Sequence, residues 1–256
     1  MKHMRKFKNE AEYRSFVEGD QFIAPNTCFL DESDHVVYEG YPEENSDPFN
    51  GYEYVDLGLP SGTLWAKCNV GGSSEGDCGL YFQWGDVVGY SSSQVGNGEG
   101  KKYFSWDDYK YCNGSSSTLT KYNTNSSYGI VDNLTTLLPE DDAASVNMGG
   151  SWHMPSKKQC EELINSSYTT SIWTIKNGVK GYLITSNTNG NTLFLPASGF
   201  LYLDYVDSKG SGGFYWSSSP NGDYPYSAYY LSSSSNKIYV SMDRRLYGNT
   251  VRGVIG

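Results

Sequence analysis

The sequence predicts an α+β domain made of short strands, few helices and long loops. Runs rich in β-branched and aromatic residues alternate with Asn-Gly turns between residues 171 and 196, a pattern typical of β-hairpins. Segments 89–102 and 113–129 are rich in Gly, Ser and Asn, which indicates loops. Signals for helix starts are few and lie in front of short stretches. Together these observations favour sheet and loop over helix.

The first fifty residues differ from the rest in charge and texture. Asn9 followed by Glu10 and Glu12 predicts a short helix through about Val17, and segments 22–30 and 35–41 predict strands. Residues 31–56 hold nine acids and no Lys or Arg, whereas 16 acids and 14 bases follow from Leu57 onward. We therefore expect residues 1–50 to form an N-terminal attachment segment with an acidic linker, and residues 51–256 to form the main domain.

Within the main domain, local signals predict the order of the elements. Segment 52–71 predicts a hairpin, and the aromatic segment 79–86 is expected to be buried. Short helices are expected from Ser105 and from Pro139, and the capping box Ser156 to Gln159 predicts a helix through about Asn165. Hairpins follow over 171–196. The six tryptophans are expected to build the core rather than to serve as sugar platforms: Trp65, Trp84, Trp106, Trp152, Trp173 and Trp216.

Composition excludes several classes of function. No basic stripe exists to neutralise phosphates, so we expect no nucleic-acid partner. The start of the chain has no apolar region typical of a secretory signal, and no run is long enough to predict membrane insertion. The five cysteines include no C-x-x-C pair, which favours free, mostly buried thiols, although a bridge between Cys68 and Cys78 remains an alternative.

Few residues of the main domain could take part in catalysis or bind a metal. His153 is the only histidine of the main domain, and nothing in the sequence supplies a nucleophile for it. Gly72 to Gly76 matches G-x-S-x-G, but it lies in a predicted loop. Glu140, Asp141 and Asp142 would suit calcium, yet acids at a helix start more often complement the helix dipole. We therefore expect no catalytic residues, no metal site and no cofactor.

The C-terminal stretch 213–256 is the strongest functional signal. It contains seven tyrosines and nine serines between short apolar anchors such as Phe214, Trp216 and Leu231. Anchors at this spacing predict strands from which the intervening polar residues project outward. Tyr, Ser and Asn are typical of binding surfaces, because Tyr gives large contact area at low entropic cost. A surface hairpin that is merely rich in Tyr and Ser remains the alternative.

Several phrases, taken in order, resemble one family. They are YVDLGLPSGTLWAKCNVG at 54–71, GLYFQWG at 79–85, PEDDAA at 139–144, GGSWHMP at 149–155, NGVKGY at 177–182, LPASG at 195–199, YWSS at 215–218 and Val251-Arg252. This set resembles the Fibrobacter major paralogous domain over roughly residues 52–256. The resemblance implies a C-type-lectin-like fold, similar to formylglycine-generating enzymes and to the variable proteins of diversity-generating retroelements.

The same resemblance implies roles for the C-terminal residues. The scaffold positions would be Trp216, Ala228, Leu231, Val240, Arg245, Gly248, Val251 and Arg252. The exposed, variable, ligand-binding positions would be Asn221, Asp223, Tyr224, Tyr226, Tyr230, Ser232, Ser234, Tyr239, Ser241, Asp243, Arg244, Tyr247 and Asn249. The calcium–sugar motifs of animal C-type lectins and the paired cysteines of formylglycine-generating enzymes are missing, so neither activity follows.

Residues 7–13, 20–26 and 35–38 resemble the start of phage or prophage structural proteins from gut bacteria. The expected protein is therefore a ligand- or receptor-binding protein of a phage tail, made in the cytoplasm and assembled into the virion. Its partner would be a protein or glycan receptor, and a homo-oligomer, such as a trimer, is expected. The alternatives are an adhesive or structural protein of the host cell surface and an enzyme of the formylglycine-generating-like fold.

Overall fold

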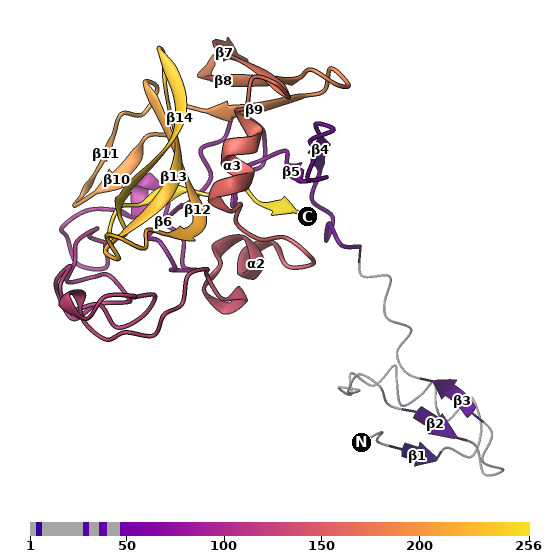
Figure 1. Ribbon diagram of the computed structural model, residues 1–256, viewed down its shortest axis with the longest axis horizontal. Helices are drawn as coiled ribbons and strands as arrows, with labels where there is room; N and C mark the ends of the chain where they lie inside the picture. Colours follow the sequence, from indigo (N-terminus) through magenta and orange to yellow (C-terminus); the bar gives the residue numbers. More distant parts are fainter. Residues whose placement is uncertain (1–3, 7–27, 31–35, 40–46) are drawn as a thin grey trace. The chain divides into compact units, whose positions relative to one another are not determined.

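The computed structural model describes residues 4–6, 28–30, 36–39 and 47–256. The chain divides into two compact units, Met1–Pro48 and Phe49–Gly256 (Figure 1). In the first unit, β1 (Met4–Lys6) pairs in parallel with β2 (Cys28–Leu30), which pairs antiparallel with β3 (Val36–Glu39). β2 and β3 confirm parts of the two expected strands. The helix expected from Asn9 lies outside the described residues.

The second unit is mostly sheet with long loops, as predicted. Its five-stranded sheet has the order β14-β13-β12-β15-β6, and smaller sheets have the orders β7-β8-β9, β16-β5-β4 and β10-β11. The described part of the chain contains two α-helices, α2 and α3. The strand bounds are β4 Tyr54–Asp56, β5 Leu64–Ala66, β6 Tyr81–Phe82, β7 Thr169–Lys176, β8 Val179–Ser186, β9 Thr192–Pro196, β10 Phe200–Tyr202, β11 Tyr205–Asp207, β12 Gly212–Pro220, β13 Ser227–Ser234, β14 Lys237–Arg244, β15 Asn249–Thr250 and β16 Val254–Ile255.

The hairpins predicted from local turn signals are confirmed. β7 and β8 are joined at Asn177-Gly178, where both residues have positive φ, 51° and 80°. Such a two-residue turn matches the twist of paired strands and favours Asn-Gly. β4 and β5 form the hairpin expected in segment 52–71. These elements form where the sequence predicts them because their turns and alternation are local.

Of the three helices predicted within residues 51–256, two are present. α3 (Lys157–Leu163) has the expected capping box, in which Ser156 and Gln159 bond each other's backbone N–H, and it ends two residues early. Pro139 opens a 3₁₀ turn, η3 (Pro139–Asp141), and α2 (Ala143–Met148) follows.

The prediction of a helix from Ser105 is wrong. Residues 105–112 form successive turns, in which the N–H of Tyr109 bonds the carbonyl of Trp106 and the N–H of Cys112 bonds that of Tyr109. Tyr109 and Tyr111 are both buried. Two residues two positions apart point to different sides of a helix, so a helix here would expose one of these rings.

The sheet β12–β14 separates two hydrophobic clusters. One holds Trp84, Trp152 and Trp216 with several tyrosines, and the other holds Trp65, Tyr215 and Leu231. Trp216 and Tyr215 are neighbours in β12 and point to opposite faces, as strand alternation requires. Trp65, Trp84, Trp152 and Trp216 are fully buried, which confirms them as core; Trp106 and Trp173 are half-buried.

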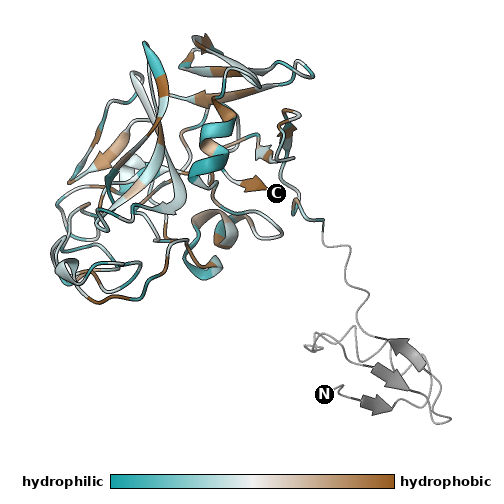
Figure 2. Cartoon of the chain, viewed as in Figure 1, coloured by the Kyte–Doolittle hydropathy of each residue, from teal (hydrophilic) through white to brown (hydrophobic). Residues whose placement is uncertain are grey.

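Other expectations concern the ends, the thiols and membranes. The C-terminal strand β16 is hydrophobic (brown in Figure 2), and its Val254 is fully buried. Cys68, Cys78, Cys112 and Cys160 are free thiols, but only Cys160 is buried, and Cys68 and Cys78 do not form a bridge. Over the residues that the structure describes, none of the helices has the length and apolar character needed to cross a membrane.

Candidate ligand-binding site

The C-terminal strands place most of the predicted ligand-binding residues on one face. β13 and β14 pair antiparallel with Tyr230 opposite Ser241, Ser232 opposite Tyr239, and Ala228 opposite Asp243. Residues directly opposite each other in a ladder project to the same face. We define the tyrosine face as this side of β13 and β14 together with the adjoining Tyr247; its members are Tyr230, Ser232, Ser234, Tyr239, Ser241, Asp243 and Tyr247.

The opposite face of the same strands is packed. Leu231 and Val240, which are opposite each other, belong to the cluster around Trp65. Lys157 of α3 places its ammonium 4.2 Å from the ring centroid of Tyr229. α3 therefore covers this side of the sheet, as Figure 1 also shows. β14 is thus anchored through Ile238 and Val240, although Met242 on the same side is 42% exposed, and the side that carries Tyr239 faces away from this cluster.

A chain of aromatic contacts extends the tyrosine face onto β10 and β11. Ring centroids lie 5.8 Å apart between Tyr230 and Phe214, 4.9 Å between Phe214 and Phe200, and 5.4 Å between Phe200 and Tyr247. Tyr202 follows at 5.1 Å from Tyr247, and it contacts Tyr205 at 6.3 Å. The sequence analysis missed these β10–β11 residues, although the run GFLYLDY at 199–205 is an aromatic signal of the same kind.

A second group of tyrosines lies at the connection between β12 and β13. The Tyr226 ring lies 5.4 Å from Tyr128 and 6.0 Å from Tyr224. Asn221 shapes this connection, because its side-chain oxygen accepts hydrogen bonds from the backbone N–H groups of Asp223 and Tyr224. Tyr128 comes from the loop 113–129, so a loop that looked featureless in sequence supports this group.

Four of the thirteen predicted ligand-binding residues are buried, which corrects the expectation that all would be exposed: Asn221, Tyr230, Ser232 and Asn249. The Tyr230 ring packs between Phe214 and Trp216, with the Trp216 centroid 5.9 Å away. Asn249 lies in β15, between β12 and β6, and Ser232 lies in β13, which has a neighbour on both sides. Cross-strand neighbours, which a single segment does not reveal, bury these side chains.

The other nine predicted residues reach the surface. Asp223, Tyr224, Tyr239 and Arg244 are exposed, and Tyr226, Ser234, Ser241, Asp243 and Tyr247 are half-buried. Arg244 follows Asp243 along β14, so strand alternation directs it away from the tyrosine face. Asp223 belongs to the β12–β13 connection. The structure therefore brings together a smaller surface than the one predicted, centred on β14.

Asp243 is the acidic group of the tyrosine face. Its carboxylate accepts a hydrogen bond of 2.8 Å from the N–H of Arg244. Burial raises the pKa of Asp243. Burial also raises the pKa of the Tyr230 and Tyr247 hydroxyls, and the nearby Asp243 charge adds to both shifts. The face therefore offers aromatic rings, hydroxyl groups and one carboxylate, which are groups for contact and hydrogen bonding.

The scaffold residues predicted beneath this surface lie in the interior. Arg245 is fully buried, with its guanidinium 4.4 Å from the Trp84 ring centroid, and it bonds the carbonyl of Tyr122 at 2.9 Å. Arg252 is also fully buried and donates to Asn69 Oδ1 at 2.8 Å and to three backbone carbonyls. Most of the other predicted scaffold positions are buried as well, except Val240, which is half-buried.

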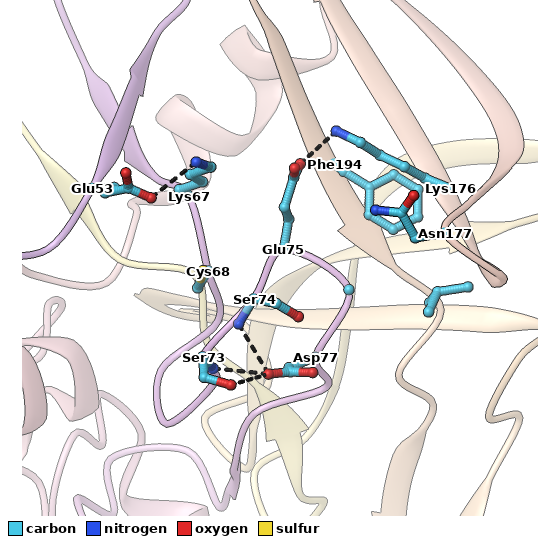
Figure 3. A pocket seen from close by; sticks show the side chains of 12 residues that line it. Glu53, Lys67, Cys68, Ser73, Ser74, Glu75, Asp77, Lys176, Asn177 and Phe194 are labelled. Atoms are coloured by element: carbon cyan, nitrogen blue, oxygen red, sulfur yellow. Dashed lines mark hydrogen bonds and ion pairs between the residues drawn. The ribbon is translucent and has the colours of Figure 1, made fainter.

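A separate cavity of about 520 Å³ lies beside β7 and the loop 72–77 (Figure 3). Glu75 reaches Lys176 at 2.7 Å, and Glu53 reaches Lys67 at 2.9 Å, so each ammonium is already paired. Cys68 also lines the cavity, and burial raises the pKa of its thiol. A raised pKa keeps a thiol protonated and weakly nucleophilic at neutral pH.

The remaining motifs have structural partners. In the loop 72–76, the Ser73 hydroxyl donates to Asp77 at 2.7 Å, and neither a preceding strand nor a following helix forms a nucleophile elbow. The two ring nitrogens of His153 lie 3.0 and 3.2 Å from the carbonyls of Met154 and Gly256. Ser73 thus holds the loop 72–76 to Asp77, and His153 contacts the backbone of Met154 and of the C-terminal Gly256.

Asp141 and Asp142 have different roles, which corrects part of the expectation that the acids 140–142 complement a helix dipole. Asp142 caps α2 by accepting from the N–H groups of Ala144 and Ser145. Asp141 instead turns inward, where Tyr122 and Lys121 donate to it at 2.6 and 2.5 Å. Among the residues described, no group of three or more potential metal ligands is assembled.

Comparison with protein-family models, with curated proteins and with solved structures found no match for this chain. The functional conclusion therefore depends on the residues and geometry of the second unit. Of its surfaces, the tyrosine face combines the exposed Tyr239 ring, serine and tyrosine hydroxyls and the half-buried Asp243 carboxylate on strands that pack against the interior.

Proposed function

We propose that this protein binds a ligand through the tyrosine face and that the partner is a protein or glycan receptor. The observation that carries the proposal is the division within β14: Tyr239, Ser241 and Asp243 face outward, while Ile238 and Val240 anchor the strand. Tyr and Ser on a fixed backbone give large contact area and adaptable hydrogen bonds at low entropic cost. No chemical step is assigned to this surface.

The proposed setting is a phage or prophage tail. The resemblance of residues 52–256 to the Fibrobacter major paralogous domain supports a C-type-lectin-like scaffold whose C-terminal positions vary. The separation of anchor and surface positions also supports variation, since the exposed residues contribute little to the core. In this proposal, residues 1–50 attach the domain to the virion, and the assembled form is a homo-oligomer such as a trimer.

A host cell-surface adhesin would use the same face. The two settings differ in their gene neighbourhood: the virion protein predicts adjacent tail genes, and the adhesin predicts a secretion signal encoded with the domain. A neighbouring reverse transcriptase, with an altered copy of the sequence that encodes residues 213–256, would support a diversified surface in either setting. The formylglycine-generating-like enzyme gains no support, because Cys68 and His153 lack the arrangement that a nucleophile needs.

The binding proposal can be tested with a matched pair of double variants. The fluorescently labelled full chain is applied to a panel of bacterial cells and to a glycan array. Tyr239→Ala with Ser241→Ala removes, from the tyrosine face, a ring that is 36% exposed and the hydroxyl two positions further along β14. The control, Tyr52→Ala with Tyr54→Ala, removes rings that are 39% and 44% exposed outside this surface.

We expect the first double variant to lose binding and the control to keep it, with both melting temperatures within a few degrees of the wild type. Loss of binding in both pairs, or in neither, would contradict the proposed surface. A large fall in melting temperature for the first pair would show that these residues support the fold instead.

A further inference from the structure

Asp243 differs from the other buried acids of the domain in how it is satisfied. Asp141 is surrounded by Lys110, Lys121, Tyr111 and Tyr122, all of which donate to it. Asp142 accepts hydrogen bonds from three backbone N–H groups, those of residues 144, 145 and 154. These contacts show how this chain stabilises a carboxylate that it needs for folding.

Asp243 has no comparable set of partners. Within the described residues, its one hydrogen bond comes from the N–H of the next residue, Arg244, at 2.8 Å. Over the described residues, no ion pair within 4.0 Å involves Asp243. A carboxylate has about four acceptor positions, and partial burial removes water from them without replacing it. A cation supplied from outside would offset that cost.

The surroundings of Asp243 suit a cation. Ala228, opposite Asp243 in the ladder, is fully buried, so a cation would approach Asp243 from the outer side of β14, which is the edge strand of the sheet. Tyr230 and Tyr247 lie close enough for the Asp243 charge to affect both hydroxyls. On the same face, the ammonium of Lys237 already lies 4.2 Å from the ring centroid of Tyr239. Rings and a carboxylate together favour a lysine or, with its planar and weakly hydrated guanidinium, an arginine.

We propose that Asp243 is the anchor of the tyrosine face and that it pairs with a lysine or arginine side chain of a protein partner. This inference depends on the proposed function, because it names the partner chemistry of the same surface. Charge complementarity favours a protein over a neutral glycan, since sugar hydroxyls do not neutralise a carboxylate.

The test uses small probes of defined charge. The full chain, labelled with ¹⁵N-tyrosine, is titrated with N-acetyl-arginine amide and, as a neutral isostere, with N-acetyl-citrulline amide. We expect the arginine probe to shift the amide signals of Tyr230, Tyr239 and Tyr247 and to bind about fivefold or more tightly than the citrulline probe. Methyl α-mannoside serves as a neutral sugar probe.

Three variants make the test specific. Asp243→Asn keeps the shape of the side chain and should reduce binding of the arginine probe to the level of the citrulline probe. Asp223→Asn removes the same charge from the exposed β12–β13 connection and should leave binding within twofold of the wild type. Asp243→Glu keeps the charge and should retain the preference for the arginine probe over the citrulline probe. If Asp243→Asn lowers the melting temperature, the Asp243→Glu result still decides the question.

Equal binding of the two amino-acid probes, or binding unaffected by Asp243→Asn, would overturn the proposal. Binding of methyl α-mannoside at the same tyrosines, with no dependence on Asp243, would also overturn it but would leave the proposed surface intact. Loss of the cell binding described above in the control pair would instead contradict the proposed function itself, so the two failures are distinguishable.

Discussion

At the scale of single residues, two buried arginines hold the C-terminal strands to the rest of the domain. Arg252 links the C-terminal segment to residues 66–69 and to β9 by donating to Asn69, Ala66, Lys67 and Phe194. Its planar guanidinium offers five donors in a fixed geometry, which suits several acceptors in different directions. Burial lowers its pKa, but an arginine remains protonated. The charge is thus satisfied by oxygen atoms rather than by an acid.

Replacing Arg252 should therefore be costly. Arg252→Met keeps much of the aliphatic length but leaves these buried acceptors unpaired, and we expect the free energy of unfolding to fall by about 3 kcal/mol or more. Urea unfolding followed by tryptophan fluorescence measures the change. Arg244→Met, at an exposed position, is the control and should change stability by about 0.5 kcal/mol or less. Similar results for the two variants would show that the Arg252 contacts contribute little.

Asp141 should make stability depend on pH in the acid range. Burial opposes its ionisation, but hydrogen bonds from Lys121, Tyr111 and Tyr122 outweigh burial and lower the pKa of Asp141 from 3.8 to about 2. Because the folded pKa lies below the unfolded one, the stabilisation is complete above about pH 4 and is lost as the pH falls through 2. The contribution is about 2 kcal/mol.

This dependence is measured by comparing the wild type with Asp141→Asn. Their difference in free energy of unfolding should shrink by about 2 kcal/mol between about pH 5 and pH 2. Asp223→Asn, which removes an exposed acid, provides the control curve. A difference for Asp141→Asn that stays constant across this range would contradict the lowered pKa.

At the scale of elements, local signals and tertiary packing divide what the sequence can predict. The hairpin at Asn177-Gly178 and the cap at Ser156 depend on residues within a few positions, so the sequence predicts them correctly. The turns at 105–112 follow from the burial of Tyr109 and Tyr111 against distant segments, so the local helix signal there misleads. Alternation along β13 and β14 predicts two faces, but it does not show that neighbouring strands bury Tyr230 and Ser232.

The β10–β11 hairpin illustrates a contact that no local pattern shows. Gly199 precedes β10 with φ of +70°, and a Cβ added there would lie 2.2 Å from the carbonyl oxygen of Asp207. Only glycine fits a positive φ and such a close approach. Gly199 therefore permits β10 to lie where Phe200 and Tyr202 contact Tyr247.

Gly199→Ala should lower the free energy of unfolding by about 2 kcal/mol or more, because it adds a backbone clash to the strain of positive φ. Gly178→Ala is the matched control: its φ is +80°, but no atom lies within 4 Å of the added Cβ. We expect it to cost about 1 kcal/mol, from strain alone. Chemical denaturation compares the two. An equal cost would mean that the structure relieves the clash at Gly199 without loss.

At the scale of the whole second unit, the C-terminal sheet has two kinds of surface. One side of β14 packs towards the Trp65 cluster and α3, and the other side carries Tyr239, Ser241 and Asp243. Anchoring from behind fixes the backbone, so the outward side chains can change with little effect on the core. This division is the physical basis for proposing a binding surface that tolerates variation.

The most direct test is a saturation scan of residues 213–256 with two readouts for every variant: resistance to proteolysis, which reports folding, and binding to the cells that the wild type binds. Substitutions at Trp216, Leu231 and Val251 should abolish both readouts. Substitutions at Tyr239, Ser241 and Asp243 should abolish binding while the chain remains folded. The account would be contradicted if substitutions at Tyr239, Ser241 and Asp243 affected folding and binding together, or if none of these three positions affected binding at all.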